Sequence, residues 1–458
     1  MFKEFLKRQL VEDVISFRFF IYTLIILVTL IVFPLIFAGR HQSRLEKISQ
    51  NTIENRRRLE VSAEHLVDLL GTQQKLYMEP RTSRFIADGH EEQMPQGFMF
   101  TMMEIRLPAE PNDSGAGILS SPDLSFIIQF VFSFFALILT FNAVSAEKEK
   151  GTLRLIFANS IERAKLLLAK YLAALLTVGI PFLAGLMISL ILLDLKRIPT
   201  LSGSFCIIIL LFFLLSLLYL SFFILLGLFF STAAVGSKNS LVLCLLSWVF
   251  VVVILPKAAG PLLNLKNFAV PTEKAIEEAA EQAYREVWDR HASENIMTGD
   301  PNWESTKLNV RISNEAGKVK QEIYDLNLRK KIQAVKTLMA VNCVSPASLY
   351  EYAASAAAGT GLPHFERFQR QVTQYQNDLL NFFKAEDMKD KESPHLFFHP
   401  DYVSSKPVDF NRIPQFKEQK PELLERIQDA AAYGAGLILY NIIMFAIVFY
   451  KFQTYDVR

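Results

Sequence analysis

Six apolar stretches constrain this chain more than any other feature of its sequence. Each is at least 18 residues long and holds at most one charged side chain. A helix of that length crosses the roughly 30 Å hydrocarbon layer of a bilayer, and helices satisfy their backbone polar groups internally. The sequence therefore predicts an all-α polytopic membrane protein with six transmembrane helices. The expected spans are residues 19–38, 124–144, 166–193, 205–230, 240–257 and 431–450.

A polar region, residues 39–123, follows the first span. Apolar residues recur at helical spacing from His41 to Leu76, which predicts a long helix. Five prolines between Pro80 and Pro122 break the remainder into loops. We expect a helix that stands off the bilayer and an irregular return.

A larger polar region, residues 258–421, precedes the last span. It is rich in Glu, Lys, Arg, Ala and Leu from Thr272 to Val341, apart from a break near Gly299, which predicts two long helices. Another helix is expected to begin at Ser345 or Pro346, and an amphipathic one to cover His364–Met388. Both polar regions are thus expected to be mainly helical.

Basic residues in the short flanks predict the orientation of the chain. The flanks on the side of the N-terminus hold thirteen Lys and Arg, against two, Lys196 and Arg197, in the opposing short turn. Cytoplasmic flanks carry the basic excess. We therefore expect an inner (plasma) membrane protein with both termini, residues 1–18 and 451–458, in the cytoplasm and both large polar regions outside. Arg40 and Arg44 lie against this rule, but they flank a long excursion, where the bias is weak.

The loop of residues 145–165, between the second and third spans, carries a distinctive charge pattern. Glu147, Lys148, Glu149 and Lys150 alternate in sign, and apolar residues recur at helical spacing after Gly151. This pattern predicts a short amphipathic helix on a membrane face. The alternative is a solvated turn whose lysines hold the loop in the cytoplasm.

The order Glu-Lys-Glu-Lys-Gly-Thr-Leu, followed by Arg-Ala-Lys-Leu-Leu-Leu-Ala-Lys at the start of a span, resembles ABC-2 type ABC transporter permeases. In that family the loop holds a coupling helix that docks on a separate ATPase subunit. A connecting helix precedes the first span, as residues 2–18 do here, and two permease subunits pair, identical or related. The resemblance implies that the docking residues are Glu147, Glu149, Lys150, Gly151, Thr152 and Arg154.

The second polar region carries a further resemblance. Residues 342–346, Asn-Cys-Val-Ser-Pro, are followed by Tyr350, a small-residue run at 353–361 and Pro363-His364-Phe365. This order is similar to permeases with a large extracytoplasmic insert before the last span, the multicopper-enzyme-maturation type. A helix break followed by an alanine-rich packing helix is compatible with the same residues.

Several functional classes find no support in the sequence. No G-x-x-x-x-G-K-[ST] phosphate loop occurs, so we expect no enzyme, no directly bound cofactor, and ATP used only by a partner subunit. An ion-coupled carrier usually requires a charged residue near the middle of a span. No predicted span has one, which argues against a secondary transporter. Lys170, in the first turn of its span, is expected to snorkel to the interface. A net charge of +2 gives no case for nucleic acid.

A metal site has weak candidates only. His395 and His399 are four residues apart with Asp401 nearby, which would suit a metal on a helix. Pro394 and Pro400 flank them and favour an extended segment instead. We therefore predict no metal.

The leading functional hypothesis is a membrane-spanning permease subunit of an ABC exporter, driven by a separate ATP-binding subunit on the coupling helix. The alternative is a non-transporting membrane scaffold or mechanotransmitting sensor whose extracytoplasmic helices bind a protein partner. Both hypotheses include contact with membrane lipids.

Overall fold

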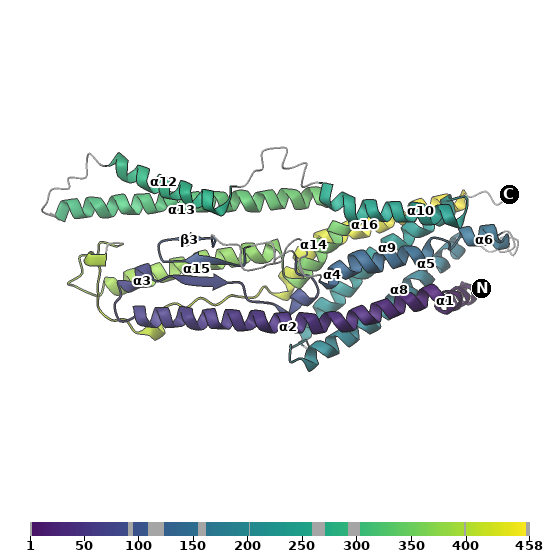
Figure 1. Ribbon diagram of the computed structural model, residues 1–458, viewed down its shortest axis with the longest axis horizontal. Helices are drawn as coiled ribbons and strands as arrows, with labels where there is room; N and C mark the ends of the chain where they lie inside the picture. Colours follow the sequence, from purple (N-terminus) through teal and green to yellow (C-terminus); the bar gives the residue numbers. More distant parts are fainter. Residues whose placement is uncertain are drawn as a thin grey trace.

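Helices dominate the computed structural model, which describes residues 2–89, 95–108, 123–153, 162–200, 202–258, 271–291, 303–397 and 400–454. They form a bundle of long apolar helices at one end and an elongated projecting region at the other (Figure 1). The projecting region comprises residues 42–108, 271–291, 303–342 and 362–421 as far as they are described. Both termini lie at the end of the bundle that points away from it (Figure 1).

Six helices of the bundle are long and apolar enough to cross a membrane. Each predicted span lies inside one of them, so the all-α architecture with six spans is confirmed. The second helix comprises α4 (Leu124–Ile127), the π-helical turn η3 (Ile128–Phe132), α5 (Ser133–Thr140) and α6 (Ser145–Glu149), and the fifth α10 (Ser237–Trp248) and the π-helical turn η4 (Val249–Ile254). The other four are α2 (Phe17–Ser62), α8 (Arg163–Leu195), α9 (Gly203–Ala233) and α16 (Leu423–Gln453).

Small residues bring the backbones of the bundle helices close together. A Cβ built on Gly227 of α9 would lie 2.0 Å from Thr140 Oγ1 of α5, and one on Gly185 of α8 would lie 2.5 Å from Leu30 of α2. Such close approach increases van der Waals contact, which drives helix association in lipid. The bundle is therefore packed tightly enough for a displacement of one helix to reach its neighbours.

The N-terminal segment forms two helices that meet at Ser16. Helix α1 (Phe2–Ile15) has one half-buried side, which includes Phe5 and Leu10, whereas Val14 is exposed. Ser16 caps α2, and its hydroxyl accepts a hydrogen bond from Phe19 N (3.2 Å). Helix α2 then continues through Pro34 to Ser62. The first span and the start of the projecting region are thus one helix (Figure 1).

The first polar region contains a small sheet that the sequence did not predict. Strands β1 (Gln74–Tyr77), β2 (Gly97–Phe100) and β3 (Ile105–Arg106) form an antiparallel sheet in the order β1-β2-β3. Phe98 packs between Phe365 and Phe368 of α15 (Leu362–Asp387), and Phe100 lies 4.9 Å from the ring of Tyr375. The strands have two to four residues, too few to show an alternating pattern. Aromatic contacts with a distant helix stabilise them instead.

Side-chain amides occupy both edges of this sheet. At the β1 edge, the Asn55 amide of α2 donates to Lys75 O (2.8 Å) and accepts from Lys75 N (3.1 Å). At the β3 edge, the Gln321 amide of α13 (Trp303–Asn342) donates to Ile105 O (3.2 Å) and accepts from Ile105 N (3.0 Å). Each amide takes the place of one residue of an added strand. Exposed edges invite pairing with other chains, and these two amides block it.

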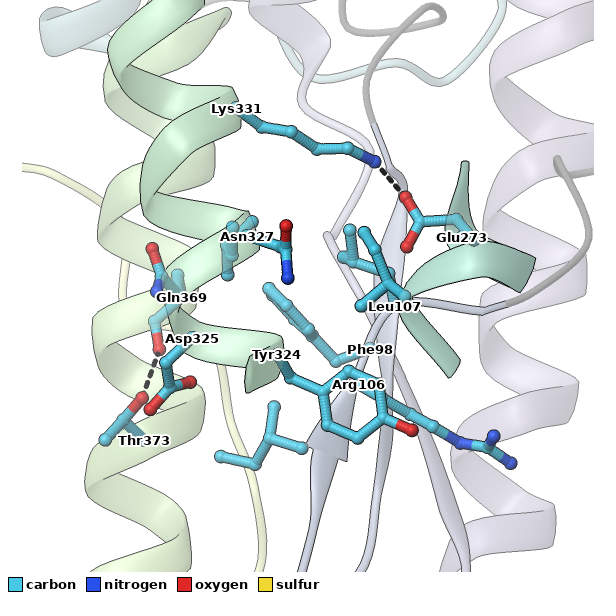
Figure 2. A pocket seen from close by; sticks show the side chains of 13 residues that line it. Phe98, Arg106, Leu107, Glu273, Tyr324, Asp325, Asn327, Lys331, Gln369 and Thr373 are labelled. Atoms are coloured by element: carbon cyan, nitrogen blue, oxygen red, sulfur yellow. Dashed lines mark hydrogen bonds and ion pairs between the residues drawn. The ribbon is translucent and has the colours of Figure 1, made fainter. Parts of the chain in front are cut away.

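Helices α12 (Glu273–Arg290) and α13 form a long hairpin that contacts the sheet through charged groups as well as apolar ones. Arg106 of β3 pairs with Glu277, and Lys320 pairs with Glu104 (3.1 Å). Between hairpin and sheet lies a cavity of about 30 Å³, where the Lys331–Glu273 pair bridges the two helices (Figure 2). The two long helices expected over 272–341 are confirmed, and they attach to the sheet through ion pairs and through Leu328, which packs in the same apolar core as Phe98.

The chain re-enters the bundle through α14 (Pro346–Ala358), a buried helix beside α9 and α16. Ser345 is its N-cap and Pro346 its first residue, so the predicted start is confirmed. The Tyr350 ring stacks on Tyr219 of α9 at 4.5 Å between ring centroids, and its hydroxyl lies 2.9 Å from Ser216 Oγ. The alanine-rich packing helix is therefore present, and its contacts with α9 and α16 attach the projecting region to the bundle.

A buried ionic group joins α14 to the projecting region. Gly359 ends α14 with φ +70°, a conformation that favours glycine. Arg81 Nη1 donates to Gly359 O (2.8 Å), and Arg81 Nη2 lies 2.9 Å from Glu418 Oε1. His364 Nε2 contacts the same oxygen at 2.8 Å. Segments far apart in the sequence thus meet at one carboxylate.

Candidate functional site

The charged loop between the second and third spans lies at the end of the bundle that carries both termini (Figure 1). Its described helix, α6, has only five residues, Ser145–Glu149. Gly151, with φ +71°, follows it, and the Thr152 hydroxyl donates to Glu147 O (3.2 Å). Arg154, one of the predicted docking residues, lies outside the described residues. We call residues 141–153 the α6 loop.

Lys170 of α8 is the centre of the contacts that hold this loop. Its Nζ donates to Glu147 Oε1 (2.7 Å), Ala143 O (2.8 Å) and Gln9 Oε1 of α1 (3.4 Å), and its side chain is 1% exposed. The expectation that Lys170 snorkels to the interface is wrong. Helix α1 and the α6 loop cover this end of α8, so the ammonium group is enclosed by acceptors. An enclosed charge needs such partners because its desolvation is costly.

Glu149 fixes the loop to α10. Its carboxylate accepts hydrogen bonds from Ser237 N (2.7 Å) and Ser237 Oγ (2.9 Å) at the first turn of α10. The N-terminus of a helix carries unsatisfied N–H groups and a partial positive charge, so a carboxylate there is stabilising. Glu149 therefore contributes to the start of the fifth span.

Further hydrogen bonds tie the preceding turn to other spans. Ser231 Oγ of α9 accepts from Val144 N (2.9 Å) and Ser145 N (3.1 Å). Arg18 of α2 donates to Asn142 Oδ1 (2.8 Å) and lies over the Phe141 ring. Together with Lys170 and Glu149, these contacts connect the α6 loop to four of the other five spans. The loop cannot shift without moving side chains on those helices.

Asp13 of α1 lies near this centre. Burial raises the pKa of the Asp13 carboxyl to about 6, although the hydrogen bond from Gln9 and the positive charge of Lys170 oppose the rise. The N-terminal helix therefore brings a partly buried acid to the same group of residues. Neither Asp13 nor Gln9 was identified as a candidate from the sequence.

The predicted docking residues divide between inward and outward positions. Glu147 is half-buried and points to Lys170, whereas Glu149, Lys150, Gly151 and Thr152 are exposed. Docking through these residues stays a prediction. The positioning residues Lys170, Ser231 and Ser237 were missed. Lys170 did carry one signal, because apart from Lys257 at the end of the fifth span it is the only charged residue within a predicted span, and a buried charge needs a partner.

The histidine pair is not assembled into a metal site in the described part of the chain. His395 Nδ1 lies 2.7 Å from Asp387 Oδ2, and His399 is outside the described residues. Among the residues that the structure describes, no group of three potential ligands is found. His395 instead stabilises the loop that follows α15.

A comparison with models of protein families identifies a family for this chain. A family model described as "ABC-2 family transporter protein" matches residues 15–457. The match covers every candidate span, the α6 loop and both polar regions. No curated protein matches the chain.

Proposed function

The chain belongs to the ABC-2 family of transporter proteins, and we propose that it is the permease subunit of an ABC exporter, driven by a separate ATP-binding subunit that docks on the α6 loop. Membership of this family implies a multi-pass membrane protein that is not itself an enzyme, an ABC ATPase partner and a dimeric arrangement. Export, the docking site and the identity of the second subunit, another copy or a related chain, belong to the proposal.

The connection of the α6 loop to several spans supports this assignment best. A docking element must receive a push at the surface and pass it to the membrane helices. Lys170 links the loop to α8, Ser231 links it to α9, and Glu149 links it to α10. Hydrogen bonds to charged groups, such as those made by Lys170 and Glu149, are among the stronger polar contacts. They give the loop the stiffness that force transmission requires.

The exposed side of the loop offers a polar contact surface for the ATPase. Lys150, Gly151 and Thr152 are exposed, and the Glu149 side chain is exposed beside them. Several weak polar and ionic contacts can fix the orientation of a partner without tight individual bonds. In the proposed complex ATP binds only to the partner, and the permease holds no cofactor.

The arrangement of the chain ends supports the proposed topology. The α6 loop, α1 and the C-terminus lie at one end of the molecule, opposite the projecting region (Figure 1). ATP-binding subunits work in the cytoplasm, so this end would face the cytoplasm and the projecting region would lie outside the inner membrane. The predicted domain boundaries and the insert-bearing subtype stay predictions.

The uninterrupted helix α2 favours a second candidate function. Because α2 runs from the first span into the projecting region, ATP-driven tilting of the bundle would also move the outer helices. A mechanotransmitting protein that acts on an extracytoplasmic partner would need this continuity. The two functions differ in their readout, since only the exporter moves a solute in reconstituted vesicles.

Affinity purification of the full-length protein from its native membranes tests the docking surface. We expect an ABC ATPase to co-purify with the wild type and to be reduced at least tenfold by K150E/T152E, which changes the exposed side of the loop. K451E, an exposed charge reversal on α16 at the same end, is the matched control and should retain the ATPase. Equal recovery from K150E/T152E and K451E would overturn docking at the α6 loop.

A further inference from the structure

Two arginines stand where the first span leaves the bilayer. Arg40 and Arg44 follow the predicted span 19–38 on the same helix, α2. Two residues of helix rise about 3 Å, so Arg40 lies at the level of the lipid headgroups. These are the residues that run against the positive-inside rule on the proposed outer side. Their position therefore calls for a reason other than membrane orientation.

The same ridge of α2 is apolar on the membrane side of the arginines. Val32, Ile36, Arg40 and Arg44 are spaced by four residues, which places neighbouring members next to each other along the helix. Val32 is 46% exposed and Ile36 is 49% exposed. The exposed side of α2 thus has apolar residues within the membrane and two guanidinium groups next to them at the membrane surface. This arrangement matches a phospholipid, whose acyl chains lie within the membrane and whose phosphate lies at its surface.

A small cavity lies beside Arg40 and Arg44, at the basic end of this ridge. It has a volume of about 30 Å³, and its lining includes Phe33, Phe37, Arg40, Arg44, Arg84 and Asp123. Arg84 comes from the segment after β1, and Asp123 lies directly before α4. The cavity therefore sits between the first span, the second span and the base of the projecting region.

The two acidic groups of the cavity are engaged in the fold. Asp123 caps α4 and accepts from Phe126 N, Ser125 Oγ and Asp88 N, each at 2.7 Å. The Asp88 carboxylate pairs with Arg84 Nε at 2.5 Å. Among the residues that line the cavity, three arginines thus stand beside two carboxylates, and both carboxylates accept hydrogen bonds or ion pairs from the fold.

We propose that Arg40 and Arg44, at the mouth of this cavity, bind the phosphate of an anionic phospholipid whose acyl chain lies along Val32 and Ile36. Guanidinium groups bind phosphate oxygens in a bidentate manner, and basic pockets between membrane helices suit anionic headgroups. Free phosphate offers the same chemistry to the arginines, but it would leave the apolar part of the ridge unused. The lipid would hold the first span at the base of the projecting region.

Native mass spectrometry of the full-length protein, titrated with phosphatidylglycerol in detergent, tests this site. We expect R40A/R44A to weaken phosphatidylglycerol binding at least tenfold. The matched control is K47A/R57A, which removes two exposed basic residues of α2 farther from the membrane and should bind as the wild type does. Because R40K/R44K keeps the charges and loses the bidentate geometry, its affinity should be intermediate.

Three arms separate the lipid from other sources of binding. Phosphatidylcholine should bind more weakly than phosphatidylglycerol, and inorganic phosphate at 10-fold molar excess over the lipid should not displace it. A circular dichroism spectrum equal to that of the wild type verifies that R40A/R44A is folded. Equal phosphatidylglycerol affinities for R40A/R44A and K47A/R57A would overturn the site. Displacement of the lipid by inorganic phosphate would overturn the lipid as its ligand.

Discussion

Lys170 Nζ and Glu147 Oε1 lie 2.7 Å apart, and the side chain of Lys170 is almost completely buried. We expect K170M to destabilise the protein by about 3 kcal/mol, because removing one partner of a buried pair leaves the other charge uncompensated. Thermal unfolding in detergent measures the loss. K165M, which removes an exposed lysine five residues earlier in α8, should change the midpoint little, and equal midpoints for the two variants would contradict the role of Lys170.

Replacing both partners should restore stability. In E147M/K170M no buried charge is left unpaired, so the double variant is expected within about 1 kcal/mol of the wild type, since apolar replacement of a buried pair is often neutral. The same thermal unfolding assay checks this. A double variant as unstable as K170M would show that the hydrogen bonds to Ala143 O and Gln9, and not the ion pair, carry the stabilisation.

The contact of Glu149 with Ser237 should stabilise the start of α10. We expect E149A to weaken the start of α10, because the carboxylate that accepts from Ser237 N and Ser237 Oγ is lost. Hydrogen exchange should become faster at the first turn of α10 and remain unchanged in α9. K148A, at the exposed neighbouring position, is the control; equally fast exchange in K148A would argue against a specific cap.

The raised pKa of Asp13 predicts a pH dependence with a definite sign. Because burial raises this pKa from 3.8 to about 6, the folded state binds a proton more readily than the unfolded state. The contribution of Asp13 to stability should therefore fall as pH rises from about 4 to 6 and stay level above about pH 7. Thermal unfolding of the wild type minus that of D13N should show this slope. A difference that rises with pH would contradict it.

The carboxylate shared by Arg81 and His364 predicts the opposite dependence. Burial alone would raise the pKa of Glu418, but the hydrogen bond and charge of His364, with the bonds from Glu79 N and Arg81, hold it below its usual value. Its contribution to stability is thus present above about pH 4.5 and is lost as pH falls further. E418Q should be less stable than the wild type at pH 7 and approach it in acid. Limited proteolysis of the projecting region checks this, with E422Q as an exposed control.

The sequence predicted the spans well because lipid tolerates very few charges, and their long apolar runs stand out. It also predicted the start of α14, since Ser345 and Pro346 combine two local signals of a helix N-terminus. These features depend on neighbouring residues alone. The helix that the sequence expected over His41–Leu76 ends at Ser62 in the structure, and the short helix α3 (Asp68–Gly71) and strand β1 follow it.

Contacts between residues far apart in the sequence could not be predicted, because the signals used depend on neighbouring residues alone. The amide of Gln321 completes the β3 edge from 216 residues away, and Lys170 meets Gln9 across 161 residues. No local pattern reveals which residues will meet at such separations. The inward orientation of Glu147 is an example, because the sequence indicated Glu147 only as a docking residue and not as a partner of Lys170.

The length of α2 has a geometric consequence. Its 46 residues correspond to a rod of about 69 Å, with about 36 Å beyond residue 38. A rotation of about 5° around the bilayer surface would displace the far tip by about 3 Å. Small angular changes inside the membrane are thereby converted into ångström-scale excursions at a remote surface, with no hinge required along the way.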